Sequence, residues 1–188
     1  VRSATMALNS EEGATACLEC LPGKAATQKG TADCSICQPG EYSLRKASAC
    51  SSCPAGRAND KKEQNSCSPC GIGKYATGLR NTICSDCTKG KFNDQTEAHF
   101  CPDCPKGKYG ESVALTVCAD CPAGKYGSSL GMDSSTKCTE CSAGKYSRSV
   151  GASDESTCEP CPAGKWASSK GSTACSLCGE GWHRPSMF

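Results

Sequence analysis

Ten C-x-x-C pairs recur along the 188 residues of the chain, and they constrain its fold more than any other feature. Successive pairs are 17 residues apart, except once 16 and twice 20. A glycine follows each second cysteine after three residues in all ten cases. This regularity predicts one small module that is repeated in tandem. The first cysteines of the pairs are Cys17, Cys34, Cys50, Cys67, Cys84, Cys101, Cys118, Cys138, Cys158 and Cys175.

The composition favours a core that is built mainly from sulfur. The chain has 20 cysteines, whereas aromatic residues make up only 5% of it. This much cysteine in a repeating frame is typical of a disulfide scaffold in an oxidising compartment. We therefore expect a small disulfide-rich fold: an elongated, solenoid-like array of short β-hairpin modules, with little regular secondary structure and no helices. The expected location is extracellular, either secreted or on the cell surface.

Loop lengths divide the chain into five predicted segments. Residues 1–16 are a cap or the remainder of a truncated module, and residues 17–121 hold short repeats of about 17 residues. Two longer repeats of about 20 residues cover 122–161, a short one covers 162–178, and 179–188 begin an incomplete module. In each repeat we expect one strand just after the glycine, and its partner strand just before the next cysteine.

Three pairing schemes of the cysteines are possible if every module is built alike. A bond within each C-x-x-C closes a very small ring, which is more typical of redox motifs. A bond from each first cysteine to the second cysteine of the next pair encloses two further cysteines. A bond from each second cysteine to the next first cysteine closes a simple loop of 13, 14 or 17 residues. We prefer this third scheme, in which each bridge contributes roughly 3 kcal/mol in the chain-entropy model.

The third scheme pairs eighteen cysteines and leaves Cys17 and Cys178 without a partner. We expect the partners of these two cysteines in sequence outside this chain. A sharper hypothesis is that Cys178 of one molecule bonds Cys17 of the next, which would produce a filament. The nine pairs are Cys20 with Cys34, Cys37 with Cys50, Cys53 with Cys67, Cys70 with Cys84, Cys87 with Cys101, Cys104 with Cys118, Cys121 with Cys138, Cys141 with Cys158, and Cys161 with Cys175.

The segment Cys104–Cys121 shows the full pattern of C-P-x-G-K-Y, a polar loop and [ST]-x-C-x-x-C. This pattern resembles the tandem cysteine-rich repeats of the ephrin-receptor-like class, which are similar to the first module type of tumour-necrosis-factor-receptor ectodomains. The resemblance covers Cys17–Gly181. It implies an elongated, extracellular, non-catalytic array and the same disulfide pairing as the third scheme. Ala25, Ala58 and Trp182-His183 depart from the pattern.

A zinc array is the main alternative, because two successive C-x-x-C pairs are spaced like a four-thiolate site. Twenty cysteines would then hold five ions. Zinc would divide the modules into alternating ligand and linker segments, yet the signature after the glycine does not alternate. Ten equivalent pairs without a βαβ frame also argue against a special redox pair. We therefore expect neither a metal nor a cofactor.

A basic residue follows the glycine in eight modules. If stacked modules align these residues into one row, the row could bind an acidic polysaccharide. The simpler interpretation is that the aliphatic stems cover disulfide and aromatic surface while the charges stay in water. The eight residues are Lys24, Arg57, Lys74, Lys91, Lys108, Lys125, Lys145 and Lys165.

The expected function is that of a structural spacer in a surface or secreted protein, which contacts other protein chains through self-association or neighbouring extracellular domains. The alternative is a ligand-binding ectodomain of a receptor or adhesion protein, with the two long loops near Met132 and Asp154 and the end from Trp166 to Trp182 as candidate contact regions. A net charge of +2 does not call for nucleic acid, and no apolar run reaches the ~20 residues that span a bilayer. The sequence shows no catalytic constellation, so we do not expect an enzyme.

Overall fold

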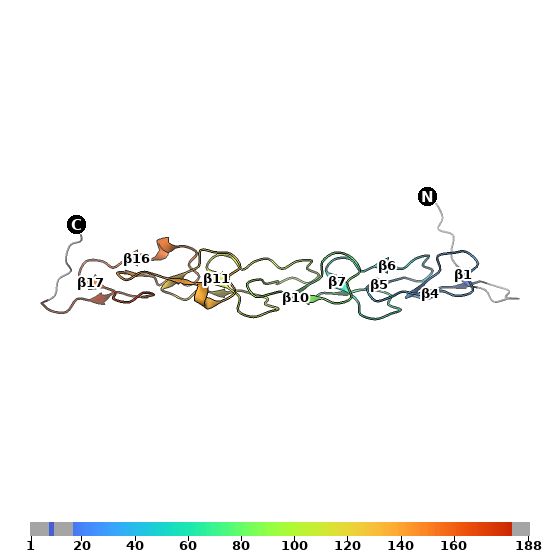
Figure 1. Cartoon of the computed structure of the whole chain (residues 1–188), viewed down its shortest axis with the longest axis horizontal. Coiled ribbons are helices and arrows are strands. Elements are labelled where there is room, and N and C mark those ends of the chain that lie inside the picture. Colours follow the sequence, from blue (N-terminus) through green and yellow to red (C-terminus); the bar gives the residue numbers. More distant parts are fainter. Residues whose placement is uncertain (1–7, 10–16, 182–188) are drawn as a thin grey trace. The chain divides into compact units, whose positions relative to one another are not determined.

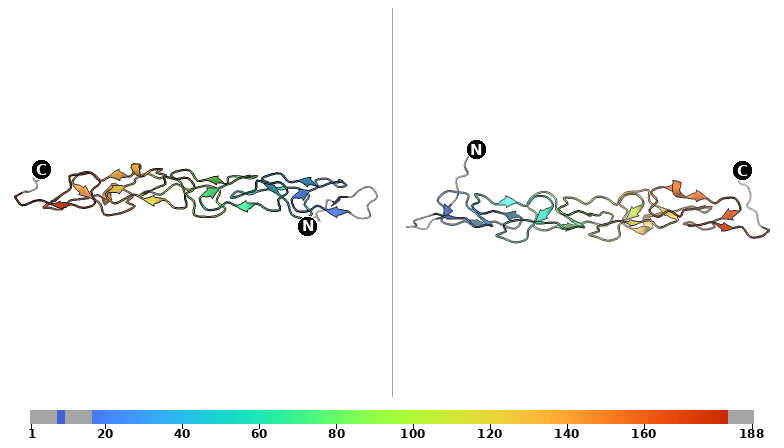
Figure 2. Two further views of the ribbon diagram at one scale, coloured as in Figure 1. Left: turned by 90° about the horizontal axis from the view of Figure 1, so that it is seen from below. Right: turned by 180° about the vertical axis from the view of Figure 1, so that it is seen from behind.

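A computed structural model describes residues 8–9 and 17–181, which divide into two compact units. Unit 1 extends to Asp86 and also includes Gln95–Phe100. Unit 2 comprises Cys87–Asp94 and the chain from Cys101 onward. Within each unit the hairpins follow one another in chain order, as Figures 1 and 2 show.

All regular strands of the described residues are two residues long, and each pairs with its sequence neighbour in an antiparallel hairpin. In unit 2, Lys91 and Asp103 form an isolated antiparallel bridge at the equivalent place. The strands of unit 1 are β1 Leu8–Asn9, β2 Leu18–Glu19, β3 Lys24–Ala25, β4 Ser35–Ile36, β5 Glu41–Tyr42, β6 Ser51–Ser52, β7 Arg57–Ala58, β8 Ser68–Pro69, β9 Lys74–Tyr75 and β10 Ser85–Asp86. Those of unit 2 are β11 Lys108–Tyr109, β12 Ala119–Asp120, β13 Lys125–Tyr126, β14 Thr139–Glu140, β15 Lys145–Tyr146, β16 Glu159–Pro160, β17 Lys165–Trp166 and β18 Ser176–Leu177.

The second strand of each module is the dipeptide inside the C-x-x-C pair. Lys24 pairs with Ile36, for example, and Ile36 lies after Cys34. The prediction that the partner strand precedes this cysteine is therefore wrong. In the turn before β3, the Lys24 N–H donates to the Leu21 carbonyl, and Cys20 packs with Cys34 and Ala26. Because the bridge from Cys20 to Cys34 occupies the position opposite Ala26, strand pairing begins at the next residues, Ala25 with Ser35.

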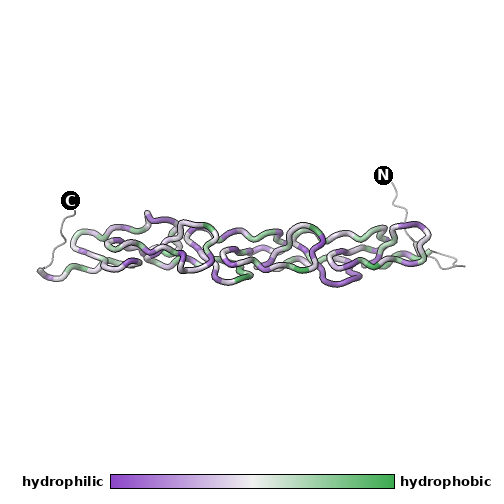
Figure 3. The backbone as a smooth tube through the Cα atoms, in the orientation of Figure 1, coloured by the Kyte–Doolittle hydropathy of each residue, from purple (hydrophilic) through white to green (hydrophobic). Residues whose placement is uncertain are grey.

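The core consists mainly of disulfide sulfur. The second cysteine of every bridged module is at most 4% exposed, whereas large aliphatic residues such as Leu18 and Leu79 are each 71% exposed. Figure 3 shows hydrophilic and hydrophobic segments alternating along the described chain. Bridges, glycines and backbone hydrogen bonds therefore replace the apolar core of an ordinary domain. The predicted fold class of a small disulfide-rich repeat array is confirmed.

The two longer loops fold their extra residues into short 3₁₀ turns, η1 Ser135–Lys137 and η2 Glu155–Thr157. Ser134 and Asp154 cap these turns, because each side chain accepts a hydrogen bond from the backbone N–H two residues later. The described residues contain no α-helix, as predicted, but the sequence analysis did not anticipate the 3₁₀ turns. No helix of the described part is long and apolar enough to cross a membrane.

Candidate functional site

The structure contains nine disulfides, and their pairing is that of the third scheme. The Cα atoms of each bridge are 5.5–5.8 Å apart, within the usual range. We number the modules by these loops, from module one (Cys20–Cys34) to module nine (Cys161–Cys175). So many bridges indicate an oxidising environment. Among the described residues, the surfaces where modules meet hold recurrent hydrogen bonds and glycine contacts.

Backbone hydrogen bonds join each module to the next by a repeated scheme. In modules two and three, the Gly40 N–H donates to the Asn59 carbonyl at 3.0 Å, and the Glu63 N–H donates to the Cys37 carbonyl at 3.1 Å. The same two bonds recur in unit 2, where Gly107 donates to Gly127 and Gly131 donates to Cys104, each at 2.8 Å. The junction therefore depends on backbone groups that every module possesses.

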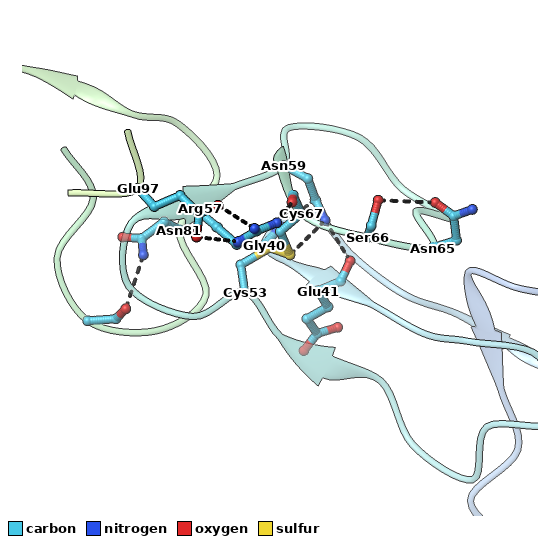
Figure 4. The surroundings of a disulfide bond; sticks show 11 residues. Gly40, Glu41, Cys53, Arg57, Asn59, Asn65, Ser66, Cys67, Asn81 and Glu97 are labelled. Atoms are coloured by element: carbon cyan, nitrogen blue, oxygen red, sulfur yellow. Dashed lines mark hydrogen bonds and ion pairs between the residues drawn. A yellow bond between two sulfur atoms is a disulfide. The ribbon is translucent and has the colours of Figure 1, made fainter. Parts of the chain in front are cut away.

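Asn59 adds a buried polar side chain to one of these junctions (Figure 4). Its Nδ2 donates to the carbonyl of Glu41 at 2.9 Å, and its Oδ1 accepts from the N–H of Gly40 at 2.9 Å. The residue is 8% exposed and lies beside the sulfur of Cys67. Ser43 occupies the equivalent position one module earlier, and its hydroxyl donates to the Lys24 carbonyl at 2.9 Å. Buried polar groups of this kind are stable because they are hydrogen-bonded.

In six modules the glycine also contacts the module two places ahead. A Cβ atom at Gly23, Gly40 or Gly56 would overlap the carbonyl oxygen of Glu63, Arg80 or Glu97, respectively. Unit 2 repeats this arrangement at Gly90, Gly107 and Gly124, which lie against Gly131, Gly151 and Gly171. This contact was not predicted from the sequence. The feature that could have indicated it is the glycine three residues after every second cysteine, because every other amino acid has a Cβ atom that would overlap the facing carbonyl.

Five loop residues have a left-handed backbone although they carry a side chain, and three of them, Glu63, Arg80 and Glu97, meet these glycines. Lys46, Glu63, Arg80, Glu97 and Ala114 have φ values of 55 to 66°. This region of φ is uncommon for residues other than glycine. Each of these residues donates its N–H to the carbonyl of a second cysteine in the preceding module. The hydrogen bond provides the compensation for the unfavourable backbone conformation.

The predicted basic row is largely neutralised by ion pairs. Lys74, Lys91 and Lys108 contact Asp86, Asp103 and Asp120 at 2.5–2.7 Å across their own hairpins. Lys125 and Lys145 likewise pair with Glu140 and Glu155. Lys24 and Arg57 instead reach Glu63 and Glu97 two modules ahead, at 3.0 and 2.5 Å. Seven of the eight residues are therefore paired, and polysaccharide binding by the row stays a prediction.

The first of the two long loops, a candidate receptor contact, has Met132 buried and Leu130 exposed. The side chain of Met132 is 2% exposed and packs with Cys121, Cys138 and Tyr109, whereas Leu130 is 62% exposed. Met132 thus fills the space beside a bridge, and the loop around it stays a candidate contact. Asp154 remains exposed, and its hydrogen bonds from Ser156 lower the pKa of its carboxyl. Trp166 is 47% exposed, whereas Trp182 lies outside the described residues.

Two cysteines of the described residues are not in a bridge: Cys17 is exposed and Cys178 is half-buried. Among the described residues, no group of three or more histidine, cysteine, aspartate or glutamate side chains could hold a metal ion. Eighteen of the twenty sulfurs that would form the four-thiolate zinc sites are bonded to one another in pairs instead. Neither a family model nor a curated protein matches the chain.

Proposed function

We propose that the array is a non-catalytic structural spacer of an extracellular or surface protein. The observation that carries this proposal is the equivalence of the junctions, because the same backbone bonds and glycine contacts recur in modules of different surface sequence. A spacer needs this repetition, since its length is set by the number of modules. Its loops are otherwise free to vary in sequence.

The alternative of a ligand-binding ectodomain requires a module that differs from the others on its surface. The candidates are the two long loops near Met132 and Asp154 and the exposed Trp166. In the first loop Met132 itself is buried against its own bridge, whereas Leu130 is exposed. A receptor face would make these residues indispensable, whereas a spacer would tolerate their replacement.

Exchange of two modules separates the two functions. Residues 70–86 and 104–120 have equal length, and each contains one lysine–aspartate pair across its hairpin. We expect the exchanged chain to be secreted, to carry nine bridges by mass, and to retain any binding to cell surfaces in flow cytometry. A second variant, Asp154→Ala with Trp166→Ala, should behave in the same way. Loss of cell binding in either variant with intact bridges would favour the receptor.

Self-association through the two unbridged cysteines is part of this proposal. Cys17 is exposed, and Cys178 is accessible in part. Head-to-tail bonds between them would produce covalent oligomers on a non-reducing gel, and Cys17→Ser should abolish these oligomers. A wild-type chain that migrates only as a monomer, with both thiols available to alkylation, would rule out the filament and leave the spacer unaffected.

A further inference from the structure

The bridges and the C-x-x-C dipeptides form a continuous covalent path through the array. Ser51–Ser52, for example, joins the bridge of Cys37–Cys50 to the bridge of Cys53–Cys67. The glycine, the strand that follows it and the loop lie outside this path, since each bridge connects the two ends of that segment directly. Every module between Cys20 and Cys175 has this topology.

The residues on the path differ in type from those outside it. The chain contains 21 lysines and arginines, yet none of the ten dipeptides holds a lysine, an arginine or an aromatic residue. Between Cys20 and Cys175, all residues of these types therefore lie in disulfide-closed loops. Several, such as Lys61, Lys62 and Lys170, are exposed. Exposed loops are where proteases cut most readily, and trypsin-like and chymotrypsin-like enzymes cut after these residue types.

We propose that the array is a tether whose covalent continuity survives cleavage of its loops by such proteases. Hydrolysis of a loop peptide bond consumes one water and leaves a new carboxylate and a new amine. Both remain attached to the array, because the bridge still joins the two ends of the cut loop. Separation requires hydrolysis within a dipeptide, where the side chains that these enzymes recognise are missing. This inference concerns the covalent path alone, so it holds for a spacer and for a receptor.

The same path limits how far the chain can be stretched. Nine bridges with Cα separations of 5.5–5.8 Å and eight dipeptide linkers extend to roughly 140 Å from Cys20 to Cys175, at about 3.6 Å per residue step. The reduced chain between the same residues extends to roughly 550 Å by the same rule. Tension is therefore carried by the bridges and the dipeptides, and the loops bear none of it.

Digestion with trypsin tests the path directly. The oxidised full chain is digested in a concentration of urea that trypsin tolerates, so that every loop is accessible, and is resolved on denaturing gels with and without reductant. We expect one main band without reductant, smaller than the array by the short peptides that two cuts within one loop release, and a ladder of small peptides with reductant. Division of the bridged array itself into two or more large fragments without reductant would overturn the proposal.

Two matched variants identify the dipeptides as the vulnerable points. Ser51→Arg places a trypsin site in a dipeptide, whereas Ser48→Arg places one three residues earlier, inside the loop of module two; both serines are exposed. We expect S51R to split into two fragments without reductant and S48R to remain one band. Intact mass before digestion confirms that all nine bridges have formed in both variants. Splitting of S48R, or survival of S51R after complete digestion, would contradict the path.

Stretching of single molecules provides an independent measurement. With handles attached beside Cys20 and Cys175, the oxidised array should reach a contour length about one quarter of that after reduction. Cys121→Ala with Cys138→Ala should lengthen the oxidised chain more than Cys37→Ala with Cys50→Ala, because the first loop spans 17 residues and the second 13. Cys17→Ala with Cys178→Ala should leave the length unchanged. Equal lengths before and after reduction would exclude the proposed path.

Discussion

Gly56 lies against the carbonyl oxygen of Glu97, two modules further along the chain, so closely that a Cβ atom would overlap it. The φ of Gly56 is also 79°, a value that side chains disfavour. Two constraints thus require glycine at this position: its own positive φ and the close approach of the Glu97 backbone. The pair is reinforced by the side chains of Arg57 and Glu97, which form two hydrogen bonds of 3.1 and 2.5 Å.

Replacement of Gly56 by alanine should therefore destabilise unit 1 strongly. The left-handed backbone costs about 1–2 kcal/mol with a Cβ atom, and overpacking costs about 1–3 kcal/mol more. Hydrogen exchange of the oxidised protein measures the effect at the Glu97 N–H, which donates to the Cys70 carbonyl. Gly71→Ala is the control, because Gly71 has no positive φ and no atom within 4 Å of its Cβ position. Equal protection in both variants would refute the steric contact.

Asn59→Ala should weaken the junction of modules two and three. The substitution removes the hydrogen bond that Asn59 donates to the Glu41 carbonyl and the bond that its Oδ1 accepts from the Gly40 N–H. The Gly40 N–H keeps its bond to the backbone carbonyl of residue 59. A lost buried hydrogen bond with one unsatisfied partner costs about 1–3 kcal/mol. Denaturant unfolding under oxidising conditions measures this loss. Asn65→Ala, at an exposed site, should have little effect, and a similar loss there would undermine the interpretation.

A cysteine at position 4 should form a bridge with Cys17. Leu8 of β1 pairs with Glu19, one residue before Cys20, in the register that Lys24 has with Ile36 before Cys37. In the repeats a cysteine stands four residues before this strand position, where the sequence has Ala4, a residue outside the described part.

We expect Ala4→Cys to leave one alkylatable thiol instead of two and to stabilise the first hairpin by roughly 3 kcal/mol. Mass spectrometry after alkylation and thermal unfolding provide the two measurements. Ala4→Ser, which has nearly the same size but cannot form a bridge, should change neither quantity. Three free thiols in Ala4→Cys would show that the hairpin of β1 and β2 differs from the other modules.

Glu19 should contribute to stability at neutral pH but not in acid. Its hydrogen bond from Lys46, together with the positive charges of Lys46 and Arg45, lowers the pKa of its carboxyl in the folded chain. Because the folded pKa lies below the unfolded one, the stabilisation is complete above the unfolded pKa and disappears as the pH falls through the folded pKa. The melting temperature of the wild type should therefore approach that of Glu19→Gln on acidification. Parallel curves for the two proteins would contradict this coupling.

Release of the basic row from its partners should increase binding to acidic polysaccharide. Asp86→Asn, Asp103→Asn and Asp120→Asn together remove the ion pairs that Lys74, Lys91 and Lys108 make across their hairpins. We expect this triple variant to elute from a column of sulfated polysaccharide at higher salt than the wild type. A control with the same net charge changes Asp33, Asp60 and Glu180 to their amides, which leaves these ion pairs intact. Equal elution of the two variants would mean that the row is not a specific site.

The repeat period predicted the modules and the preferred pairing of bridges, because each bridge closes a local loop whose ends are adjacent in the cysteine pattern. The contact between Gly56 and Glu97 could not be predicted in this way. It joins residues separated by one complete intervening module, and spacing alone does not say which neighbour a glycine faces. The partners of Lys24 and Arg57 were missed for the same reason, since Glu63 and Glu97 belong to distant loops.

Burial of Met132 was also beyond the sequence pattern. The three extra residues of this loop predicted only that the disulfide frame tolerates a longer loop, because loop closure depends weakly on length. In the structure the extra residues form η1, and Met132 fills the space beside Gly127, where a Cβ atom would overlap its side chain. The missing side chain of Gly127 thus provides the space that Met132 occupies. The sequence pattern does not show that these two residues are in contact.

The glycine contacts two modules ahead change the kind of cooperativity that the array can have. A repeat protein whose units touch only their neighbours behaves as a one-dimensional lattice with nearest-neighbour coupling. Here a module also contacts the module two places away. Unfolding of module three therefore removes a contact of module one, through Gly23, and a contact of module five, through Gly56. Within each unit, the stability of a module therefore depends on several modules at once. Local unfolding of one module also destabilises modules that are not its immediate neighbours.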